Sequence, residues 1–216
     1  MALRSGASAS LDFERDLWAR GFARVCGIDE AGRGPLAGPV VAAAVVLPPS
    51  FAHPFLTDSK KLSAAQREEA FERLTRDPGV AWGVARVEAE EIDRVNILRA
   101  TWMAMVAARE GLSPPPDWTL VDGRSVPPLG DACTAVVRGD ALSLSIAAAS
   151  VIAKVTRDRR MEELDRVHPS YGFARHKGYG TAAHLRALRE NGPCAAHRRS
   201  FLPVAIAAKD FSRRSE

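Results

Sequence analysis

Residues 27–35 of the chain read GIDEAGRGP, so two adjacent carboxylates stand immediately before a glycine-rich turn. Residues 23–29 predict a short strand, and the almost wholly apolar residues 37–47 predict a buried strand that ends at two prolines. Paired carboxylates at the edge of an apolar core repel one another and lose water, and a divalent cation offsets that cost. An outward-facing acidic turn explains the pair equally well. Arg33, between two glycines, favours a ligand, because a glycine backbone approaches closely and a guanidinium matches phosphate.

The composition is that of a globular protein that can build one sizeable core. The 216 residues are 46% hydrophobic and 26% charged, with a net charge of +4 and a pI of about 9.2, which suits a nucleic-acid partner without demanding one. The three cysteines form no Cys-x-x-Cys, which argues against a disulfide framework or a structural zinc site and favours a reducing compartment. No apolar run is long enough to cross a membrane. We therefore expect a cytoplasmic monomer without membrane contact.

Hydrophobic periodicity predicts a mixed α/β sheet with helices on both faces. The first two strands are expected to form an antiparallel pair. Ser63 and Gln66 predict a capping box at the start of one helix. Strands are expected at 23–29, 37–47, 80–87, 118–123 and 134–137, and helices at 11–20, 64–76, 92–110, 145–167 and 181–190. We expect one domain over residues 11–206, including a small helical C-terminal region, with residues 1–10 and 207–216 as flexible tails.

Three of the predicted strands end in acidic residues. Asp29 and Glu30 follow the first strand, Asp122 ends the fourth, and Asp140 follows the fifth. If these strands are neighbours, four carboxylates converge at one edge, and an oxygen-only set suits Mg²⁺ or Mn²⁺ and the two-metal hydrolysis of a phosphodiester. Taken singly, Asp122 is also an ordinary turn residue before a glycine, and Asp140 is also a favourable charge at the N-terminus of the following helix.

Three clusters have the chemistry to contact a nucleic-acid backbone. They consist of Gly32, Arg33 and Gly34; of Ser59, Lys60 and Lys61; and of His176, Lys177 and Tyr179. At least half of the hydrogen bonds in protein–nucleic acid complexes go to phosphate and sugar, so such clusters near a metal site are consistent with a nucleic-acid substrate. Tyr179 lies between glycines, and its ring is expected outside the core, where it can stack on a sugar or base.

Other basic and aromatic residues are interpreted as surface or packing residues. Tyr171 and Phe173 are expected to pack their own loop. A solvated helix surface is expected for Arg157, Arg159 and Arg160, and either a phosphate contact or a surface position for His197, Arg198 and Arg199.

The motif GIDEAGRGPLAGPV at residues 27–40 resembles the signature of the ribonuclease HII family, the type 2 ribonucleases H. Further matches occur in the order that the family shows. They are DSKKLS at 58–63, VDG at 121–123, GD at 139–140, AAASVIAKVTRD at 147–158, HKGYGT at 176–181 and HRRSF at 197–201. Together the motifs cover residues 25–201, and their spacing resembles the bacterial form of the family.

The resemblance implies a ribonuclease H-like fold and an endonuclease that uses Mg²⁺ or Mn²⁺. Such an enzyme cuts the RNA strand of RNA–DNA hybrids and incises 5′ of single ribonucleotides in duplex DNA, leaving 3′-hydroxyl and 5′-phosphate ends, as in ribonucleotide excision repair. The catalytic and metal-binding residues that it implies are Asp29, Glu30, Asp122 and Asp140. The substrate-binding residues that it implies are Gly32, Arg33, Gly34, Ser59, Lys60, Lys61, Lys154, His176, Lys177 and Tyr179, of which the 32–34 turn and Tyr179 read the 2′-hydroxyl and the RNA–DNA junction. Asp158 is given a helix-surface or structural role.

Three other functions are weighed against this one. A dinucleotide-binding oxidoreductase requires Gly-x-Gly-x-x-Gly before a helix, whereas here the spacing differs and a strand follows. A non-catalytic hybrid-binding protein would tolerate loss of the acids, yet all four are present. The sister family, ribonuclease HIII, usually carries an additional N-terminal domain, and only about two dozen residues precede the first motif.

Overall fold

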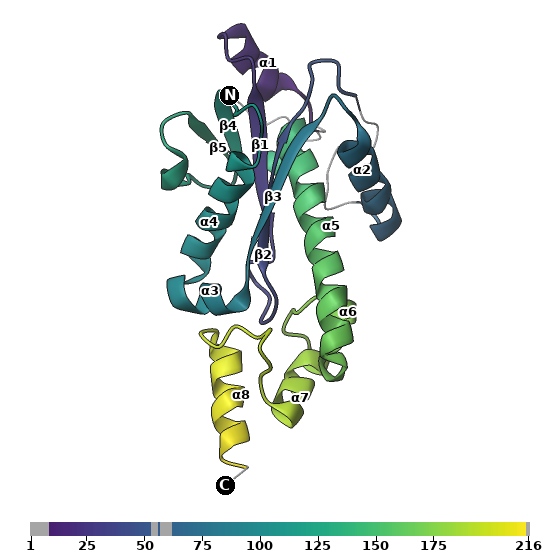
Figure 1. Ribbon diagram of the computed structural model, residues 1–216, viewed down its shortest axis with the longest axis vertical. Helices are drawn as coiled ribbons and strands as arrows, with labels where there is room; N and C mark the ends of the chain where they lie inside the picture. Colours follow the sequence, from purple (N-terminus) through teal and green to yellow (C-terminus); the bar gives the residue numbers. More distant parts are fainter. Residues whose placement is uncertain (1–8, 53–55, 57–61, 215–216) are drawn as a thin grey trace. The chain divides into compact units, whose positions relative to one another are not determined.

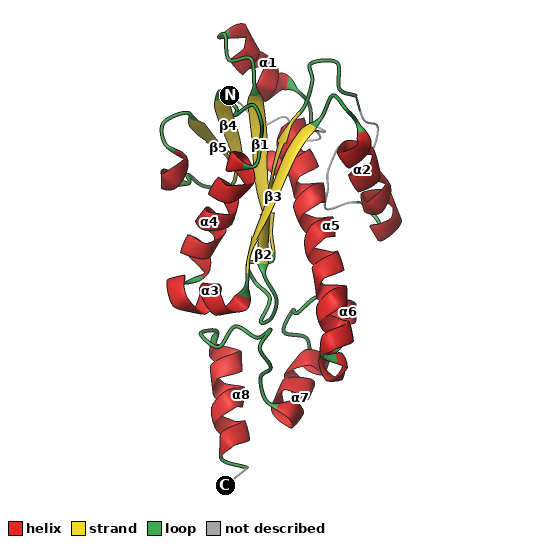
Figure 2. Cartoon of the chain, viewed as in Figure 1, coloured by secondary structure: helices red, strands yellow, loops and turns green. Residues whose placement is uncertain are grey.

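The computed structural model describes residues 9–52, 56 and 62–214, and the chain falls into two compact units (Figure 1). Unit 1 comprises Met1–Glu30, Ala42–Ala85 and Ala104–Val155, and unit 2 comprises Ala31–Val41, Arg86–Met103 and Thr156–Glu216. Figure 2 shows a sheet with flanking helices, which confirms the predicted fold class.

The five-stranded sheet, most of which belongs to unit 1, places two acid-bearing strands side by side. Its order is β3-β2-β1-β4-β5, with β1 at Val25–Ala31, β2 at Val40–Val46, β3 at Ala81–Val87, β4 at Trp118–Asp122 and β5 at Cys133–Val136. Strands β1 and β4 are parallel, with Ile28 opposite Val121, and β4 and β5 are parallel, with Asp122 opposite Val136. Because parallel strands end at the same edge of a sheet, the acids at the C-terminal ends of β1 and β4 share one edge.

The helices agree with most of the predicted ranges. They are α1 (Asp12–Ala19), α2 (Ala64–Arg76), α3 (Ala89–Val95), α4 (Ile97–Glu110), α5 (Leu144–Val167), α6 (Phe173–His176), α7 (Ala182–Asn191) and α8 (Leu202–Ser212), with 3₁₀ turns η2 (Pro127–Leu129), η3 (Gly139–Ala141) and η4 (Pro169–Tyr171). The predicted capping box is present: Ser63 Oγ accepts a bond from the N–H of Gln66 at 3.2 Å, and the Ser63 N–H donates to Gln66 Oε1 at 2.9 Å. Among the helices described, none has the length and hydropathy of a membrane span.

The first half of α5 packs into the core of unit 1, as its all-round apolar sequence predicts. Ile146 and the alanines that follow it are fully buried, and Ile146 packs with Val25, Leu120 and Val136. Gly27 in β1 permits this close approach, because a methyl group there would collide with the backbone at the start of α5. The acid-bearing end of β1 is thus held rigidly against a buried helix.

The predicted helix over residues 92–110 is wrong in one respect, since the structure divides it into α3 and α4 at Asn96. Asn96 adopts a positive φ of 72° and ends α3. Its Oδ1 accepts bonds from the N–H groups of Leu98 and Arg99 at 3.0 and 3.1 Å, so the same residue caps α4. Asparagine tolerates this backbone region and supplies a capping oxygen, which explains the break in an otherwise continuous apolar pattern.

Unit 2 contains the helical C-terminal region. Helices α7 and α8 pack through a cluster that includes Leu188, Val204 and Ala207. Helix α8 continues to Ser212, six residues beyond the limit of 206 that the sequence suggests for the domain.

Candidate active site

The first two carboxylates lie at the end of β1. Asp29 is buried, with 6% of its surface exposed, and its Oδ1 accepts a hydrogen bond from the N–H of Glu30 at 2.7 Å. Glu30 is half-buried. The hydroxyl of Ser150, on α5, also hydrogen-bonds Asp29. Ser150 is a site residue that sequence reasoning missed, although it is the one polar residue in the apolar run 146–153.

The other two carboxylates lie at the end of β4 and in the turn that follows β5. Asp122 ends β4, and its Oδ1 accepts a hydrogen bond from the N–H of Gly139 at 2.6 Å. The next residue, Asp140, lies in η3 and has only 2% of its surface exposed. Strands β1, β4 and β5 are neighbours in the sheet, which is the condition that the sequence argument set. We name Asp29, Glu30, Asp122 and Asp140 the acid edge.

The carboxylates of the acid edge repel one another's negative charge. The pKa of Asp29 is raised well above its usual range, first by burial and then by the charges of Glu30 and Asp122, while the Ser150 hydrogen bond opposes the rise. This is the condition in which a divalent cation stabilises a site, because it removes both the repulsion and the cost of burial.

The donor set fits Mg²⁺ or Mn²⁺ in an open site. Among the residues that the structure describes, no group of three or more His, Cys, Asp or Glu side chains is placed to hold a metal ion. Mg²⁺ does not need such a group, because it usually keeps several waters and binds one or two carboxylates together with substrate phosphates. Carboxylates that share a sheet edge meet that requirement.

The glycine turn, residues 32–34, lies in unit 2 and is held by a buried guanidinium. Gly32 has a positive φ of 99°, and Arg33 and Gly34 are exposed. Arg198 is fully buried and donates to the carbonyls of Gly32 at 2.6 Å and Arg33 at 2.9 Å. It also donates to the carbonyls of Pro35 and Gly38, at 2.8 and 3.0 Å. Neither alternative considered for Arg198, a phosphate contact or a surface position, is correct.

A second buried guanidinium corrects another prediction. Arg157, expected on a solvated helix surface, has 1% of its surface exposed. Its Nε donates to the carbonyl of Pro39 at 3.0 Å, and its Nη2 donates to the carbonyl of Ala37 at 3.2 Å. Burial lowers the pKa of both Arg157 and Arg198. Backbone carbonyls thus take the place of water around two cations that hold the segment 32–39.

Tyr179 stands beside the glycine turn within unit 2. About half of it is exposed, which confirms that its ring lies outside the core. The Cε1 atom of its ring is the nearest atom, at 3.8 Å, to the place where a Cβ on Gly34 would lie. An exposed aromatic ring next to an exposed glycine is suited to contact a sugar and its 2′-hydroxyl.

The remaining predicted substrate-binding residues lie in different environments. The ring nitrogens of His176 contact the carbonyl of Tyr171 at 2.7 Å and the N–H of Gly178 at 3.2 Å. Lys177 forms an ion pair with Glu162 at 2.7 Å. Lys154 is half-buried on α5, and Ser59, Lys60 and Lys61 lie outside the described residues.

The packing prediction for Tyr171 and Phe173 is confirmed, because both are buried and their rings stack at 5.4 Å. His197 is buried as well, which excludes both a phosphate contact and a surface position for it. Arg199 is exposed, and its N–H donates to Asp93 at 2.7 Å.

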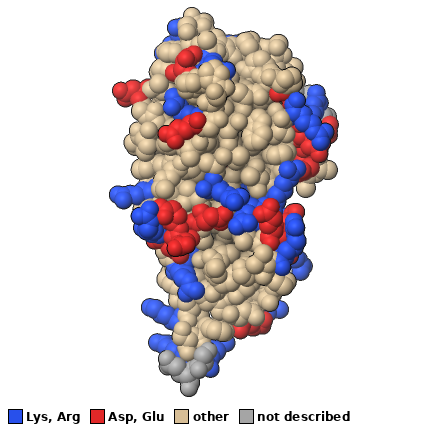
Figure 3. All heavy atoms as spheres, viewed as in Figure 1, with Lys and Arg blue, Asp and Glu red and all other residues tan. Residues whose placement is uncertain are grey.

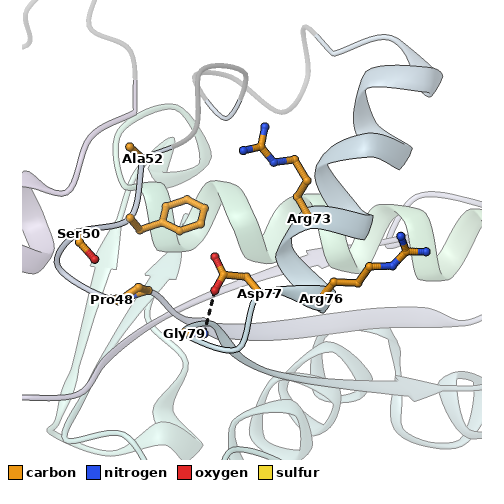
Figure 4. A pocket seen from close by; sticks show the side chains of 8 residues that line it. Pro48, Ser50, Ala52, Arg73, Arg76, Asp77 and Gly79 are labelled. Carbon is orange, nitrogen blue, oxygen red and sulfur yellow. Dashed lines mark hydrogen bonds between the residues drawn. The ribbon is translucent and has the colours of Figure 1, made fainter.

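Neither the surface charge nor the described pocket identifies the site. Figure 3 shows acidic and basic side chains interspersed on the face drawn rather than gathered into one basic patch. A pocket of about 620 Å³ is lined by Arg73, Arg76 and Asp77 and by residues of the loop 48–52 (Figure 4). It contains none of the acid edge, and Asp77 Oδ1 is already bonded to the N–H of Gly79 at 2.8 Å. The carboxylates therefore define the candidate active site.

Comparison with known proteins gives consistent matches. A family model described as Ribonuclease HII matches residues 26–204. A ribonuclease HII of Myxococcus xanthus is 54% identical over 90% of this chain and 66% of its own length, and one of Syntrophobacter fumaroxidans is 57% identical over 88% and 82%. The crystal structure of ribonuclease H2 from Pyrococcus horikoshii superposes with a TM-score of 0.75 and 28% identity, covering 88% of this chain and 99% of that one. A ribonuclease HIII solved in complex with Mn²⁺, at 19% identity and a TM-score of 0.64 over 90% of this chain and 72% of that one, shares the fold.

Proposed function

We propose that this chain, which belongs to the ribonuclease HII family, incises duplex DNA at single embedded ribonucleotides. Membership of the family already gives it divalent-metal-dependent ribonuclease H activity on RNA–DNA hybrids. The cut falls 5′ of the ribonucleotide and leaves 3′-hydroxyl and 5′-phosphate ends, which makes the protein an initiator of ribonucleotide excision repair. It acts as a cytoplasmic monomer with one catalytic domain that includes the helical C-terminal region. The observation that carries this proposal is the acid edge, where parallel strands end in carboxylates and Asp29 has a raised pKa.

The acid edge performs the hydrolysis. Asp29, Glu30, Asp122 and Asp140 supply the carboxylate oxygens that hold Mg²⁺ or Mn²⁺. When bound, a pair of such ions lowers the pKa of an attacking water and stabilises the leaving oxygen. The hydroxyl of Ser150 orients Asp29, and the Gly139 N–H orients Asp122, so that both carboxylates are fixed before substrate arrives.

The glycine turn and Tyr179 recognise the ribonucleotide. Arg33 supplies a guanidinium for a phosphate, and the exposed backbone of Gly34 approaches the 2′-hydroxyl, which is the group that distinguishes RNA from DNA. Tyr179 stacks on the sugar or base at the junction. Further phosphate contacts come from Ser59, Lys60, Lys61, Lys154 and Lys177, whereas both ring nitrogens of His176 are already bonded within the protein. The two buried arginines keep the turn from moving when substrate binds.

The test is cleavage of two labelled substrates, a DNA duplex with one ribonucleotide and an RNA–DNA hybrid, with and without added Mg²⁺ or Mn²⁺. We expect metal-dependent cleavage of both, with the cut in the first substrate 5′ of the ribonucleotide. Asp29→Asn should cut neither, and the matched control Asp16→Asn, an exposed carboxylate on α1, should cut both. Tight binding without cleavage by the wild-type protein would instead make it a hybrid-binding protein. Cleavage of the hybrid alone would remove the assignments of Tyr179 and the glycine turn.

A further inference from the structure

Three histidines of unit 2 form a network behind the Tyr179 loop, and the catalytic account uses none of their contacts. His184 and His197 are buried, with 0% and 2% of their surfaces exposed, and their Nε2 atoms lie 3.1 Å apart. His176 stacks on His184 with ring centroids 4.4 Å apart. We call these three residues the histidine network.

The contacts of His184 and His197 determine which nitrogen of each ring carries a proton. The carbonyl of Tyr179 can only accept, so His184 Nδ1, at 2.9 Å, donates to it. A neutral His184 ring then has an acceptor at Nε2, and His197 Nε2 must donate to that atom. This leaves His197 Nδ1 as an acceptor, and it receives the N–H of Cys194 at 3.1 Å. Every position in this chain of bonds is matched only when both rings are neutral.

His176 obeys the same logic. Its Nε2 donates to the carbonyl of Tyr171, and its Nδ1 accepts the N–H of Gly178. The Tyr179 N–H in turn donates to the His176 carbonyl at 2.9 Å. The Tyr179 backbone is therefore held through its carbonyl by His184 and through its N–H by His176.

The surroundings of the two buried rings keep them uncharged. His184 is faced by His176, and His197 is faced by His168, Arg199, Cys194 and the edge of the Tyr171 ring. Burial lowers the pKa of His184, and burial followed by the proximity of His184 lowers the pKa of His197 to about 3. A proton added to either ring would place two N–H donors opposite each other, and the hydrogen bond at that position would be lost.

We propose that His184 and His197 are positioning residues, which act through the Tyr179 backbone to hold the tyrosine ring beside Gly34. This rests on the proposed role of Tyr179 in reading the ribonucleotide junction. A ring on a loosened backbone would still meet substrate, but it would select the junction poorly, because the geometry of a recognition site must be held before binding.

The first measurement is the nitrogen NMR spectrum of the wild-type protein labelled at histidine. We expect the Nδ1–H tautomer for His184 and the Nε2–H tautomer for His197, both neutral at neutral pH and at about pH 6. The opposite tautomer at either residue, or a charged ring at about pH 6, overturns the proposal. This measurement needs no variant.

The second measurement is selectivity, defined as kcat/KM for the single-ribonucleotide duplex divided by kcat/KM for the hybrid. His184→Phe removes both bonds of the ring, and we expect selectivity to fall about tenfold, the effect of one lost stacking contact on the substrate. His184→Asn retains a donor near the position of Nδ1 and should restore part of the loss. Glu190→Gln, an exposed change on the same helix, is the control and should leave selectivity unchanged.

Combining variants separates this proposal from the one on which it rests. In a Tyr179→Ala background, His184→Phe should cause no further loss of selectivity, because both changes remove the same function. If Tyr179→Ala alone leaves selectivity unchanged, the junction-reading role itself is wrong. If Tyr179→Ala lowers selectivity but His184→Phe and His184→Asn do not, only the positioning role is wrong. The same conclusion follows if the losses of selectivity caused by Tyr179→Ala and His184→Phe add in the double variant. If His184→Phe does not fold, the selectivity of His184→Asn and the histidine tautomers of the wild-type protein test the proposal in its place.

Discussion

In unit 1 the functional groups are carboxylates whose charges repel one another, whereas in unit 2 the glycine turn is held by a buried guanidinium that donates to its carbonyls. The acid edge gathers carboxylates at the ends of β1 and β4 and raises the pKa of Asp29. The glycine turn instead has its carbonyls bound by Arg198. The difference separates two tasks: carboxylates whose mutual repulsion opposes their ionisation suit a site that binds a cation, and a turn held by fixed donors suits a site that reads shape.

The largest effect is expected at the acid edge. Loss of a residue that only supports a metal ligand costs up to about 10²-fold in activity. Loss of a ligand itself should cost more, so Asp29→Asn and Asp122→Asn should each reduce cleavage of both substrates by more than about 10²-fold. Duplex binding should remain. Without metal, Asp29→Asn should be at least as stable to urea as wild type, because it removes a buried charge with a raised pKa. A clear loss of stability would show that the acid edge is a structural ion-pair network.

The next effect concerns the stability of unit 2. Arg198→Met removes a buried cation and leaves four backbone carbonyls without that donor, so we expect a loss of about 3 kcal/mol in the free energy of unfolding. Arg199→Ala is the matched control, because Arg199 is the adjacent residue and is exposed. It should cost less than about 0.5 kcal/mol in the free energy of unfolding. Urea denaturation measures both. Equal losses would mean that Arg198 does not hold the turn.

A smaller effect is expected for recognition. Tyr179→Ala should lower the selectivity for a single embedded ribonucleotide about tenfold, because a ring stacked on a base contributes about 1–3 kcal/mol. Unfolding free energy should change little, since about half of the residue is exposed. Cleavage kinetics on the two substrates measure the ratio. An equal loss on both would indicate a general contact rather than junction recognition.

The smallest effect is the response of the metal-free protein to pH, which has opposite signs in the two units. The native pKa of Asp29 is raised, so its contribution to stability is present below about pH 4, the value for the unfolded chain, and is lost as the pH rises through the native pKa. The pKa of His197 is lowered to about 3, so its contribution is complete above about pH 6.5 and is lost as the pH falls towards 3.

Urea unfolding across pH tests these signs through variants. Asp29→Asn should remove the loss of stability that occurs as the pH rises. His197→Gln should reduce the loss that occurs as the pH falls, by at most about 1.4 kcal/mol per pH unit. The account of the two units is contradicted if Asp29→Asn changes the loss of stability at falling pH, or if His197→Gln changes the loss of stability at rising pH.

The acid edge was accessible from sequence because its information is local. Each carboxylate follows an apolar strand, and strand ends of a parallel sheet meet at one edge, so Asp29, Asp122 and Asp140 could be grouped before any contact was known. Ser150 offered a weaker signal, as one hydroxyl in a buried apolar run. The ordered motifs then identified the family.

The support of the glycine turn was not accessible, because it depends on contacts distant in sequence. Arg157 looks like any arginine on an amphipathic helix, yet it donates to carbonyls more than a hundred residues away. Arg198 is similar. The helix break at Asn96 was missed for a different reason: its apolar pattern continues, and only the positive φ of one residue divides α3 from α4. Burial of long polar side chains is decided by the tertiary structure that supplies their partners.

The most direct test of this division of tasks is to measure binding and cleavage of both substrates by Asp122→Asn and Tyr179→Ala alongside the wild type. The account predicts that Asp122→Asn binds the single-ribonucleotide duplex with the wild-type preference but does not cut it. Tyr179→Ala should still cut with added metal but lose most of that preference. The account is contradicted if Asp122→Asn loses the preference, or if Tyr179→Ala retains it in full.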